Sequence, residues 1–379
     1  MKNQARRGPR PRERVRPRGK RGARPAADAF RDVVAVLMAG GAGVRFWPLS
    51  TPTRPKQFLT ELAGRSLYVQ AFERARSLVP PARIQVMTGA GFLDFVREQT
   101  PGVPRGNVIL EPLRRDTAAA AILAALVVAR RRPDGIMIVL PSDHFVGDAA
   151  EFRQTMAAAV ARARRGGLGT VGIRPTRPAT DFGYLQLADP PMPRRPQRVE
   201  RFVEKPRRRK AEQYVASGTY LWNSGIFVWQ ARELLRAAEQ HLPGTYRALA
   251  GLADAVTAKD FPRRAKRAFS RIRPISVDYG IMEKADDVWC VPGAFEWDDV
   301  GGWLAAERLM PADARGNRIR GRVFLDEVAG TLVLGQPDHP IAVAGLTDCI
   351  IVHSEAGSLV CHKSAVERIK PLIQRLLEG

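Results

Sequence analysis

The sequence is poor in cysteine, and it lacks an apolar run long enough to cross a bilayer. Its three cysteines, Cys290, Cys349 and Cys361, are an odd number and form no Cys-x-x-Cys pair. They therefore make a poor disulfide framework and fit a reducing compartment. The longest apolar run, residues 118–129, is far shorter than the roughly 20 residues that a membrane-spanning helix needs. We expect a cytoplasmic protein with no membrane partner.

The chain also has few acidic residues relative to basic ones, with 38 Asp and Glu against 61 Lys and Arg and a net charge of +23. Residues 1–31 supply +10 of this charge. Residues 1–30 have almost nothing to bury, which predicts a disordered basic tail; binding of this arm to a polyanion is the alternative. The remaining charge is spread along the chain and attracts sugar phosphates and nucleotides as readily as DNA.

The basic tail precedes a short apolar run, residues 33–39, and so imitates a secretory signal peptide. The run ends in Gly40-Gly41, and a first buried strand explains it better. With 379 residues, 45% of them hydrophobic and 26% charged, the chain has the composition of a globular protein of two or three domains.

From residue 32 onward, short β-rich runs alternate with helical stretches. We expect strands at residues 33–38, 84–88, 108–111 and 136–140, and helices at 67–78, 91–99 and 117–130. This alternation predicts an α/β fold, a Rossmann-like, mostly parallel sheet covered on both faces. Ligands bind such sheets beyond the carboxyl ends of the strands, which directs attention to residues 40–45, 111–117 and 141–144.

The pattern changes after about residue 311. Short alternating stretches at residues 321–325, 330–334, 341–344, 349–353 and 358–361 predict a small β domain, and Ser364 is placed to cap a final helix ending at residue 377. The expected domains are therefore a tail at 1–30, an α/β domain at 31–310 and a C-terminal domain at 311–379.

The most informative segment follows the first expected strand. It reads Leu-Met-Ala-Gly-Gly-Ala-Gly-Val-Arg-Phe-Trp-Pro-Leu-Ser from Leu37 to Ser50, and Arg-Pro-Lys-Gln-Phe follows at residues 54–58. No Gly-Lys-Ser/Thr is present, so it is not a P-loop. Gly40, Gly41 and Gly43 allow backbone N–H groups to approach a phosphate chain, and Arg45 and Lys56 can neutralise its charge.

This segment resembles the signature of the sugar-1-phosphate nucleotidyltransferases, in the version found in mannose-1-phosphate guanylyltransferases. Seven further blocks agree in order: Glu111-Pro112, residues 141–144 (Pro-Ser-Asp-His), 182–184 (Phe-Gly-Tyr), 202–206 (Phe-Val-Glu-Lys-Pro), 222–227 (Trp-Asn-Ser-Gly-Ile-Phe), 276–284 and 297–301 (Trp-Asp-Asp-Val-Gly). The resemblance covers roughly residues 32–370. It implies transfer of GMP from GTP to mannose 1-phosphate, giving GDP-mannose and pyrophosphate.

The resemblance also implies the roles of individual residues. Arg45 and Lys56 would hold the triphosphate, and Asp143 and Asp299 match the family's Mg²⁺ carboxylates, with Asp298 as the neighbouring competitor. The residues implied for the sugar phosphate are Gly183, Tyr184, Glu204, Lys205 and Asn223.

Recognition of the base is expected at Glu111, because a carboxylate can accept from both N1–H and the N2 amino group of guanine. Asp116 and Thr117 follow in the nucleotide-binding block. The family usually has Asn where Asp116 stands, so this chain keeps an acceptor and loses a donor at that position. The details of base contact are therefore open.

For the C-terminal domain the resemblance implies a short left-handed β-helix, a structure used for packing between domains or subunits, and it leaves a homodimer open. Two other readings remain: a guanylyltransferase for another sugar 1-phosphate, such as a heptose or glucose, and a non-catalytic protein of this fold that binds polyanions through its tail. The identities of the residues do not decide the sugar epimer.

Overall fold

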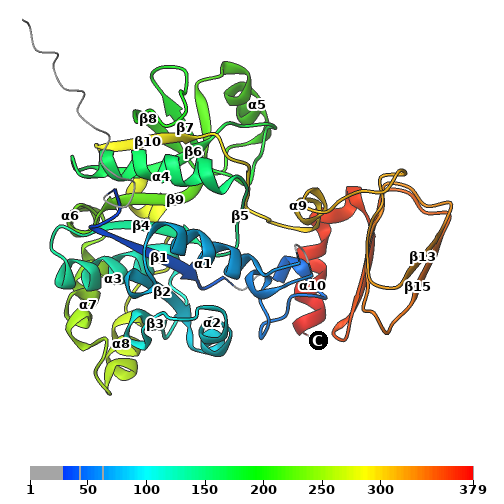
Figure 1. Ribbon diagram of the computed structural model, residues 1–379, viewed down its shortest axis with the longest axis horizontal. Helices are drawn as coiled ribbons and strands as arrows, with labels where there is room; N and C mark the ends of the chain where they lie inside the picture. Colours follow the sequence, from blue (N-terminus) through cyan, green and yellow to red (C-terminus); the bar gives the residue numbers. More distant parts are fainter. Residues whose placement is uncertain (1–28, 42–43, 62–63, 379) are drawn as a thin grey trace, which may run out of the picture.

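The computed structural model describes residues 29–41, 44–61 and 64–378. It contains an α/β body and, at its side, a smaller body of short strands formed by the C-terminal part of the chain (Figure 1). The expected basic tail lies outside the described residues except for Ala29 and Phe30, and so does Gly43. Within the described residues, no helix is both long and apolar enough to cross a membrane.

A nine-stranded sheet forms the centre of the α/β body. Its strands, in spatial order, are β3 (Val108–Glu111), β2 (Ile84–Gly89), β1 (Val33–Ala39), β4 (Ile136–Pro141), β9 (Tyr220–Gln230), β6 (Leu168–Ile173), β10 (Val288–Gly293), β8 (Gln197–Val203) and β7 (Tyr184–Leu187).

The sheet is mixed rather than mostly parallel. Strands β3, β2, β1 and β4 pair in parallel, as do β6 and β10. Strand β9 runs antiparallel to β4, β6 and β7, and β8 runs antiparallel to β10 and β7. The expectation of a mostly parallel sheet is therefore wrong for the whole sheet, although it holds for the half in which strands were predicted.

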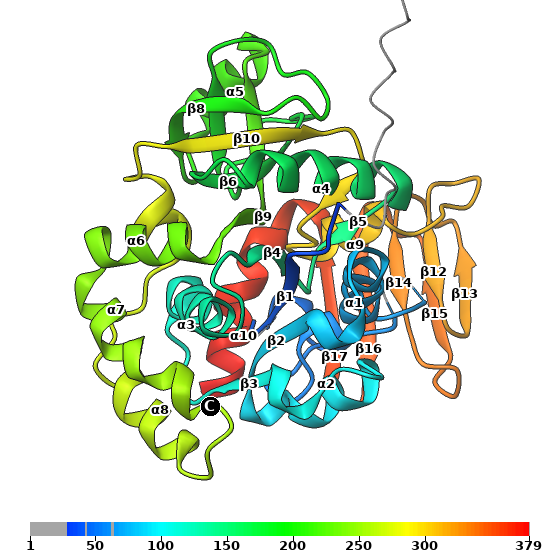
Figure 2. The same ribbon diagram turned by 60° about the vertical axis from the view of Figure 1, so that its left-hand side comes forward.

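Both faces of the sheet are covered, as the sequence predicted, and strand β1 shows how. Its residues Val34 and Val36 pack into one apolar layer with α3 (Asp116–Arg131) and α6 (Ala231–His241). Ala35 and Leu37 pack into the opposite layer. Because each face of β1 is buried, the strand is apolar throughout instead of alternating. Figures 1 and 2 show α3 and α4 (Ala149–Ala163) on opposite sides of the sheet.

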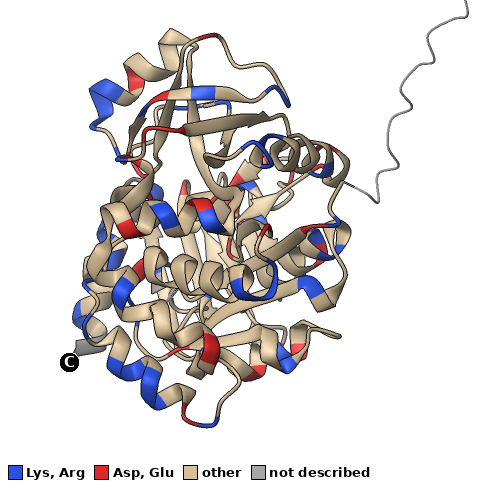
Figure 3. Ribbon diagram, turned by 90° about the vertical axis from the view of Figure 1, so that its left-hand side faces the viewer, with Lys and Arg blue, Asp and Glu red and all other residues tan. Residues whose placement is uncertain are grey.

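The other helices of this body are α1 (Leu67–Leu78), α2 (Leu93–Gln99), α5 (Arg208–Ser217), α7 (Pro243–Leu249), α8 (Phe261–Phe269) and α9 (Trp303–Arg308). Helices α1, α2 and α3 and strands β1 to β4 confirm the predicted elements to within two residues. Helix α1 begins where Ser66 accepts a hydrogen bond from the Val69 N–H, a normal N-cap. Basic residues are distributed over many helices and mixed with acidic ones (Figure 3).

The C-terminal body consists of short strands stacked in register. Strands β12 (Arg318–Arg320), β14 (Leu332–Leu334) and β16 (Cys349–Ser354) pair in parallel, β17 (Gly357–His362) adds antiparallel to β16, and β13 (Val323–Asp326) pairs in parallel with β15 (Ile341–Ala344). The final helix α10 (Ile369–Glu378) starts after a 3-10 turn at Lys363–Arg368. The expected cap at Ser364 is wrong, because the His362 side chain accepts from the Ser364 N–H and caps that turn instead.

The two bodies share one apolar cluster. From the α/β body it takes Phe46, Trp47 and Val300, and from the strands of the C-terminal body it takes Leu332 and Ile350. The Ser354 hydroxyl also donates to the Pro48 carbonyl over 2.7 Å. The Phe-Trp-Pro stretch of the signature segment is therefore part of the surface on which the C-terminal body packs.

Candidate active site

A cavity of about 830 Å³ opens at the carboxyl ends of β1, β2, β3 and β4. The three segments that the sequence singled out, after β1, β3 and β4, all contribute to its lining. Of the predicted site residues, those in the lining are Gly40, Gly41, Glu111, Asp116, Thr117 and Asp143. The topology of parallel strands thus brings together residues that lie about 100 positions apart.

Glu111 ends strand β3 and points its carboxylate toward Gly40, where an added methyl group would lie 3.6 Å from Glu111 Oε1. Burial raises the pKa of Glu111 to about 7. No Lys, Arg or His of the described residues forms an ion pair with it. An acceptor that is buried without a cation is suited to a ligand that donates hydrogen bonds.

The start of α3 is tied to the segment that precedes Asp278. Asp116 has φ 61° and accepts from the Thr117 N–H through Oδ1 over 2.7 Å. The Thr117 hydroxyl accepts from the Val277 N–H over 2.9 Å. Asn and Asp tolerate this left-handed conformation better than most residues. Asp116 therefore shapes the turn, and Thr117 holds residues 275–277 against the cavity.

Asp278 is a candidate site residue that the sequence reasoning did not select. It lines the cavity, and its Oδ1 accepts from the Asn223 side-chain amide over 2.8 Å. Burial, reinforced by the charge of Glu204, raises its pKa to about 7. The sequence signal was its place in the block at residues 276–284, where it is the first acidic residue.

The residues expected at the sugar phosphate form a second group that meets the cavity at Asp278. Lys205 donates to Glu204 Oε1 over 2.8 Å, and although burial opposes it, this contact raises the pKa of Lys205. A methyl group at Gly183 would lie 2.4 Å from Glu204 Oε2, so the carboxylate occupies the space that glycine leaves. Asn223 connects the group to the core, because its Oδ1 accepts from Thr170.

Tyr184 does not join this group. Its side chain is fully buried, and its hydroxyl donates to the Ala179 carbonyl over 3.0 Å. Neighbouring residues of a strand face opposite sides of a sheet, so the position next to Gly183 packs into the apolar layer.

Asp143 connects the cavity to a third group, which contains the expected phosphate and metal residues. Its Oδ2 lies 3.0 Å from the ammonium of the buried Lys56. Although burial opposes it, the charge of Lys56 lowers the pKa of Asp143. Lys56 also donates to the carbonyls of Asp299 and Val300, over 2.8 and 2.9 Å. All three N–H bonds of Lys56 thus have partners within the protein.

The turn at residues 298–301 distinguishes the two neighbouring aspartates. Asp298 Oδ2 accepts two hydrogen bonds from Arg308, and its Oδ1 accepts from the Val300 N–H. Among the described residues, Asp299 accepts only from the Gly301 N–H, and burial raises its pKa to about 6. Arg45 is exposed and donates to the Gly301 carbonyl over 3.3 Å. Asp299 is therefore the carboxylate with an oxygen to spare.

These carboxylates suit a divalent cation that is also held by substrate and water. Within the described residues, no three His, Cys, Asp or Glu side chains form a cage for an ion. Asp143 and Asp299 offer oxygen ligands from two chain segments that Lys56 joins. Such a set suits Mg²⁺, which is usually held by one or two carboxylates together with substrate phosphates and water.

Known proteins are similar to this chain in sequence and fold. Residues 34–315 match the family described as nucleotidyl transferase. The xanthan biosynthesis protein XanB of Xanthomonas campestris pv. campestris (strain B100) is 35% identical over 351 residues, which cover 91% of this chain and 73% of XanB. A mannose-1-phosphate guanylyltransferase of Sinorhizobium fredii (strain NBRC 101917 / NGR234) is 34% identical over 348 residues, covering 91% of this chain and 68% of that protein.

Among solved structures, a protein from Thermus thermophilus described as a mannose-1-phosphate geranyltransferase aligns with a TM-score of 0.80 and 33% sequence identity. The alignment covers 91% of this chain and 99% of that one, so it includes both bodies.

Proposed function

This chain belongs to the nucleotidyl transferase family, and we propose that it is a mannose-1-phosphate guanylyltransferase that makes GDP-mannose and pyrophosphate from GTP and mannose 1-phosphate. Relatives named for this activity, 34% identical over nearly the whole chain, support the assignment. The observation that carries it is one cavity lined both by Glu111, a carboxylate with no ion pair among the described residues, and by Asp143 with its Lys56 contact.

Glu111 is the proposed reader of the base. Its ionised carboxylate accepts the N1–H and N2 amino protons of guanine, whereas uracil and thymine offer a single N–H. Gly40 and Gly41, which lie in the cavity wall, permit close approach of the nucleotide, and Gly43 belongs to the same loop. Asp116 and Thr117 complete this side through the turn that they stabilise.

The Glu204 and Lys205 pair is the proposed sugar-phosphate site. Glu204 accepts from sugar hydroxyls, and Lys205, whose side chain is 55% exposed, supplies positive charge to the phosphate. Gly183 leaves room for the ring beside Glu204. Asn223 contributes by fixing Asp278 through its amide. Tyr184 has no part in the proposal.

The reaction is attack by a phosphate oxygen of mannose 1-phosphate on the α-phosphorus of GTP, with pyrophosphate as leaving group. Positioning and charge stabilisation account for most catalysis of this kind. Asp143 and Asp299 would hold Mg²⁺, which supplies positive charge to the phosphates. Arg45 contributes its exposed guanidinium to the triphosphate. Lys56 keeps Asp143 beside the Asp299 turn and contacts a phosphate only if it releases one of its protein acceptors.

The proposal also includes the domain boundaries and the cellular location. We take residues 31–310 as the catalytic domain and 311–379 as a left-handed β-helix-like domain with its terminal helix, and we place the protein in the cytoplasm. The parallel stacking of β12, β14 and β16 supports the β-helix assignment. A homodimer through this domain is compatible with the proposal, which does not require it.

The experiment that tests the function is a matrix of substrates. Pyrophosphate release is measured with GTP, ATP, UTP and dTTP against mannose, glucose and heptose 1-phosphates, with and without Mg²⁺. A dominant signal for GTP and mannose 1-phosphate that chelation abolishes supports the proposal. A different preferred pair corrects Glu111 or the sugar site, and no release from any pair rejects the enzyme activity.

A further inference from the structure

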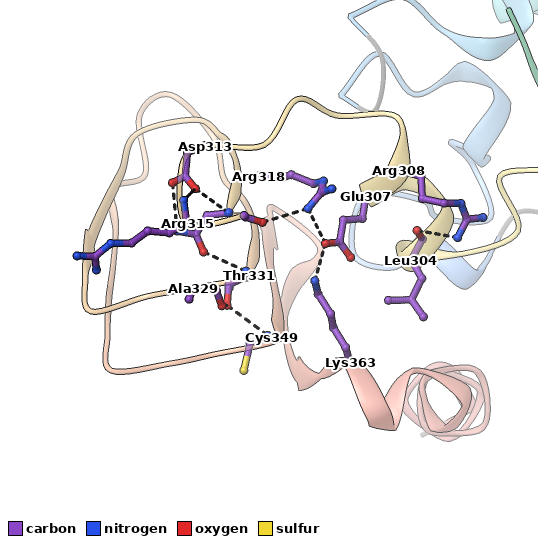
Figure 4. A network of polar contacts seen from close by, with 12 residues as sticks. Leu304, Glu307, Arg308, Asp313, Arg315, Arg318, Ala329, Thr331, Cys349 and Lys363 are labelled. Atoms are coloured by element: carbon purple, nitrogen blue, oxygen red, sulfur yellow. Dashed lines mark hydrogen bonds and ion pairs between the residues drawn. The ribbon is translucent and has the colours of Figure 1, made fainter. Parts of the chain in front are cut away.

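Helix α9 contacts three parts of the molecule: the segment at Phe46, the turn at Asp298 and the C-terminal body. Its first residue, Trp303, packs edge-on against Phe46, next to Arg45, with ring centroids 5.0 Å apart. Its last residue, Arg308, binds Asp298, next to Asp299, over 2.6 Å. Between them, Glu307 faces the C-terminal body (Figure 4).

Glu307 is the polar centre of this connection. Its Oε1 accepts from Arg318 Nη1 of strand β12 over 2.9 Å and from Lys363 Nζ, just after strand β17, over 2.5 Å. The Glu307 side chain is only 12% exposed, and the two cations are 23% and 19% exposed. Two cations thus converge on one buried carboxylate, an arrangement that is costly to break.

The turn that this helix follows has a strained backbone. Val300 has φ 50°, a left-handed conformation that a β-branched residue rarely adopts. Such conformations persist only where the surroundings impose them. Here the surroundings are the Asp298 carboxylate, which accepts from the Val300 N–H, and the shared apolar cluster, in which Val300 is fully buried and to which residues of the C-terminal body also belong.

From these contacts we infer that Glu307 is a positioning residue: through α9, it lets the C-terminal body hold the Asp299 turn in its strained, metal-ready conformation. The inference rests on the proposed function for its catalytic consequence. It gives the C-terminal domain a task in the reaction, because the geometry of the turn depends on packing that this domain supplies.

The test uses the full chain with Glu307→Ala and Glu307→Gln. The matched control is Glu233→Ala, since Glu233 is 15% exposed and is paired with Arg236 on α6. The first measurement is amide hydrogen exchange in peptides covering residues 298–303, without substrates. We expect faster exchange there in Glu307→Ala, no change in Glu233→Ala, and an intermediate rate in Glu307→Gln, whose amide oxygen still accepts from Arg318 and Lys363.

The second measurement is kcat and KM in GDP-mannose synthesis. We expect kcat of Glu307→Ala to fall at least about tenfold, since a displacement of about 1 Å at a reacting centre can cost about a hundredfold, with Glu307→Gln partly restoring it and the control unaffected. Equal thermal destabilisation of Glu307→Ala and the control, with unchanged exchange and kcat, would reject the inference.

If Glu307→Ala does not fold, Lys363→Met replaces it. Amide hydrogen exchange in residues 298–303 must then also be faster than in the wild type, by a smaller factor, or the inference is wrong. If the wild-type protein makes no GDP-mannose, the proposed function fails, while hydrogen exchange still decides whether Glu307 controls the turn.

Discussion

The ammonium of Lys56 lies 3.0 Å from Asp143 Oδ2 while it donates to the main-chain carbonyls of Asp299 and Val300. One buried cation therefore joins the segment after β4 to the turn that contains Asp299. A lysine that the sequence assigns to phosphate binding thus holds together the two chain segments that carry the proposed metal ligands.

Replacing Lys56 with Met should destabilise the protein and remove most turnover. Methionine keeps the apolar stem and leaves a carboxylate and two carbonyls without their donor. Breaking a buried ion pair costs roughly 3–5 kcal/mol; we expect about 2–3 kcal/mol because the Asp143 side chain is 34% exposed. Denaturant unfolding measures the loss, with the exposed Lys210→Met as control. A change below about 0.5 kcal/mol would mean that Lys56 is not the tether.

Asp143→Asn and Asp299→Asn should each lower turnover at limiting Mg²⁺ by about a hundredfold or more, since a metal ion contributes several kcal/mol of charge stabilisation. Both changes keep the side-chain volume. Asp134→Asn, at an 84% exposed carboxylate paired with Arg232, controls for loss of charge. Calorimetry of GTP binding with and without Mg²⁺ separates metal binding from chemistry. Normal turnover in either variant at limiting Mg²⁺ would exclude that aspartate as a ligand.

Gly183→Ala should impair use of mannose 1-phosphate and spare GTP. The new methyl group would meet Glu204 Oε2 at 2.4 Å, so the carboxylate must move. Loss of one hydrogen bond to a charged group costs about 1.5–3 kcal/mol, so the KM for mannose 1-phosphate should rise about tenfold or more. At Gly244, nothing lies within 4 Å of an added methyl group, which makes Gly244→Ala the control. Equal effects on the KM of both substrates would contradict the placement of the sugar at Glu204.

The first four strands and α1 to α3 could be predicted because their signals are local: continuous apolar runs, helical periodicity and glycine punctuation. The antiparallel strands β7, β8 and β9 could not, because their direction follows from pairings between segments far apart in the chain. The prediction for Ser364 failed for a different reason, because His362 caps the turn through a local side-chain contact that the sequence does not reveal.

At the candidate site, the position of a residue just after a strand correctly predicted that it lines the cavity. The direction in which a side chain faces could not be predicted in this way. Glu111 and Asp143 follow β3 and β4 and line the cavity. Tyr184 stood in the same family block as Gly183, yet the face of the sheet that it occupies depends on strand register. The position of Asp278 depends on two contacts between distant segments, Thr117 with Val277 and Asn223 with Asp278, which form only in the folded chain.

GTP binding should weaken as the pH falls below about 7. Burial raises the pKa of Glu111 to about 7, and guanine needs the ionised form as acceptor. Between pH 8 and pH 6 the ionised fraction of a group with this pKa drops about tenfold, and the affinity should follow. Calorimetry with GTP measures it. Because the phosphates of GTP also titrate, the comparison is with Glu111→Gln, which should lack the Glu111 part of the change; identical pH profiles would remove Glu111 from base recognition.

Glu111→Gln should also make the protein more stable and less specific for GTP. The folded protein holds the Glu111 proton more tightly than the unfolded chain, whose carboxyl has its ordinary pKa of 4.5. Wild-type stability without nucleotide is therefore lost as the pH rises from about 4.5 through about 7, by up to about 3 kcal/mol. Glutamine carries no such cost, so the variant should gain on the wild type between pH 5 and pH 8 in denaturant unfolding, while its preference for GTP over UTP and dTTP declines. An advantage that is equal at both pH values would show that Glu111 is not a buried carboxylate with a raised pKa, and the base would have to be read elsewhere.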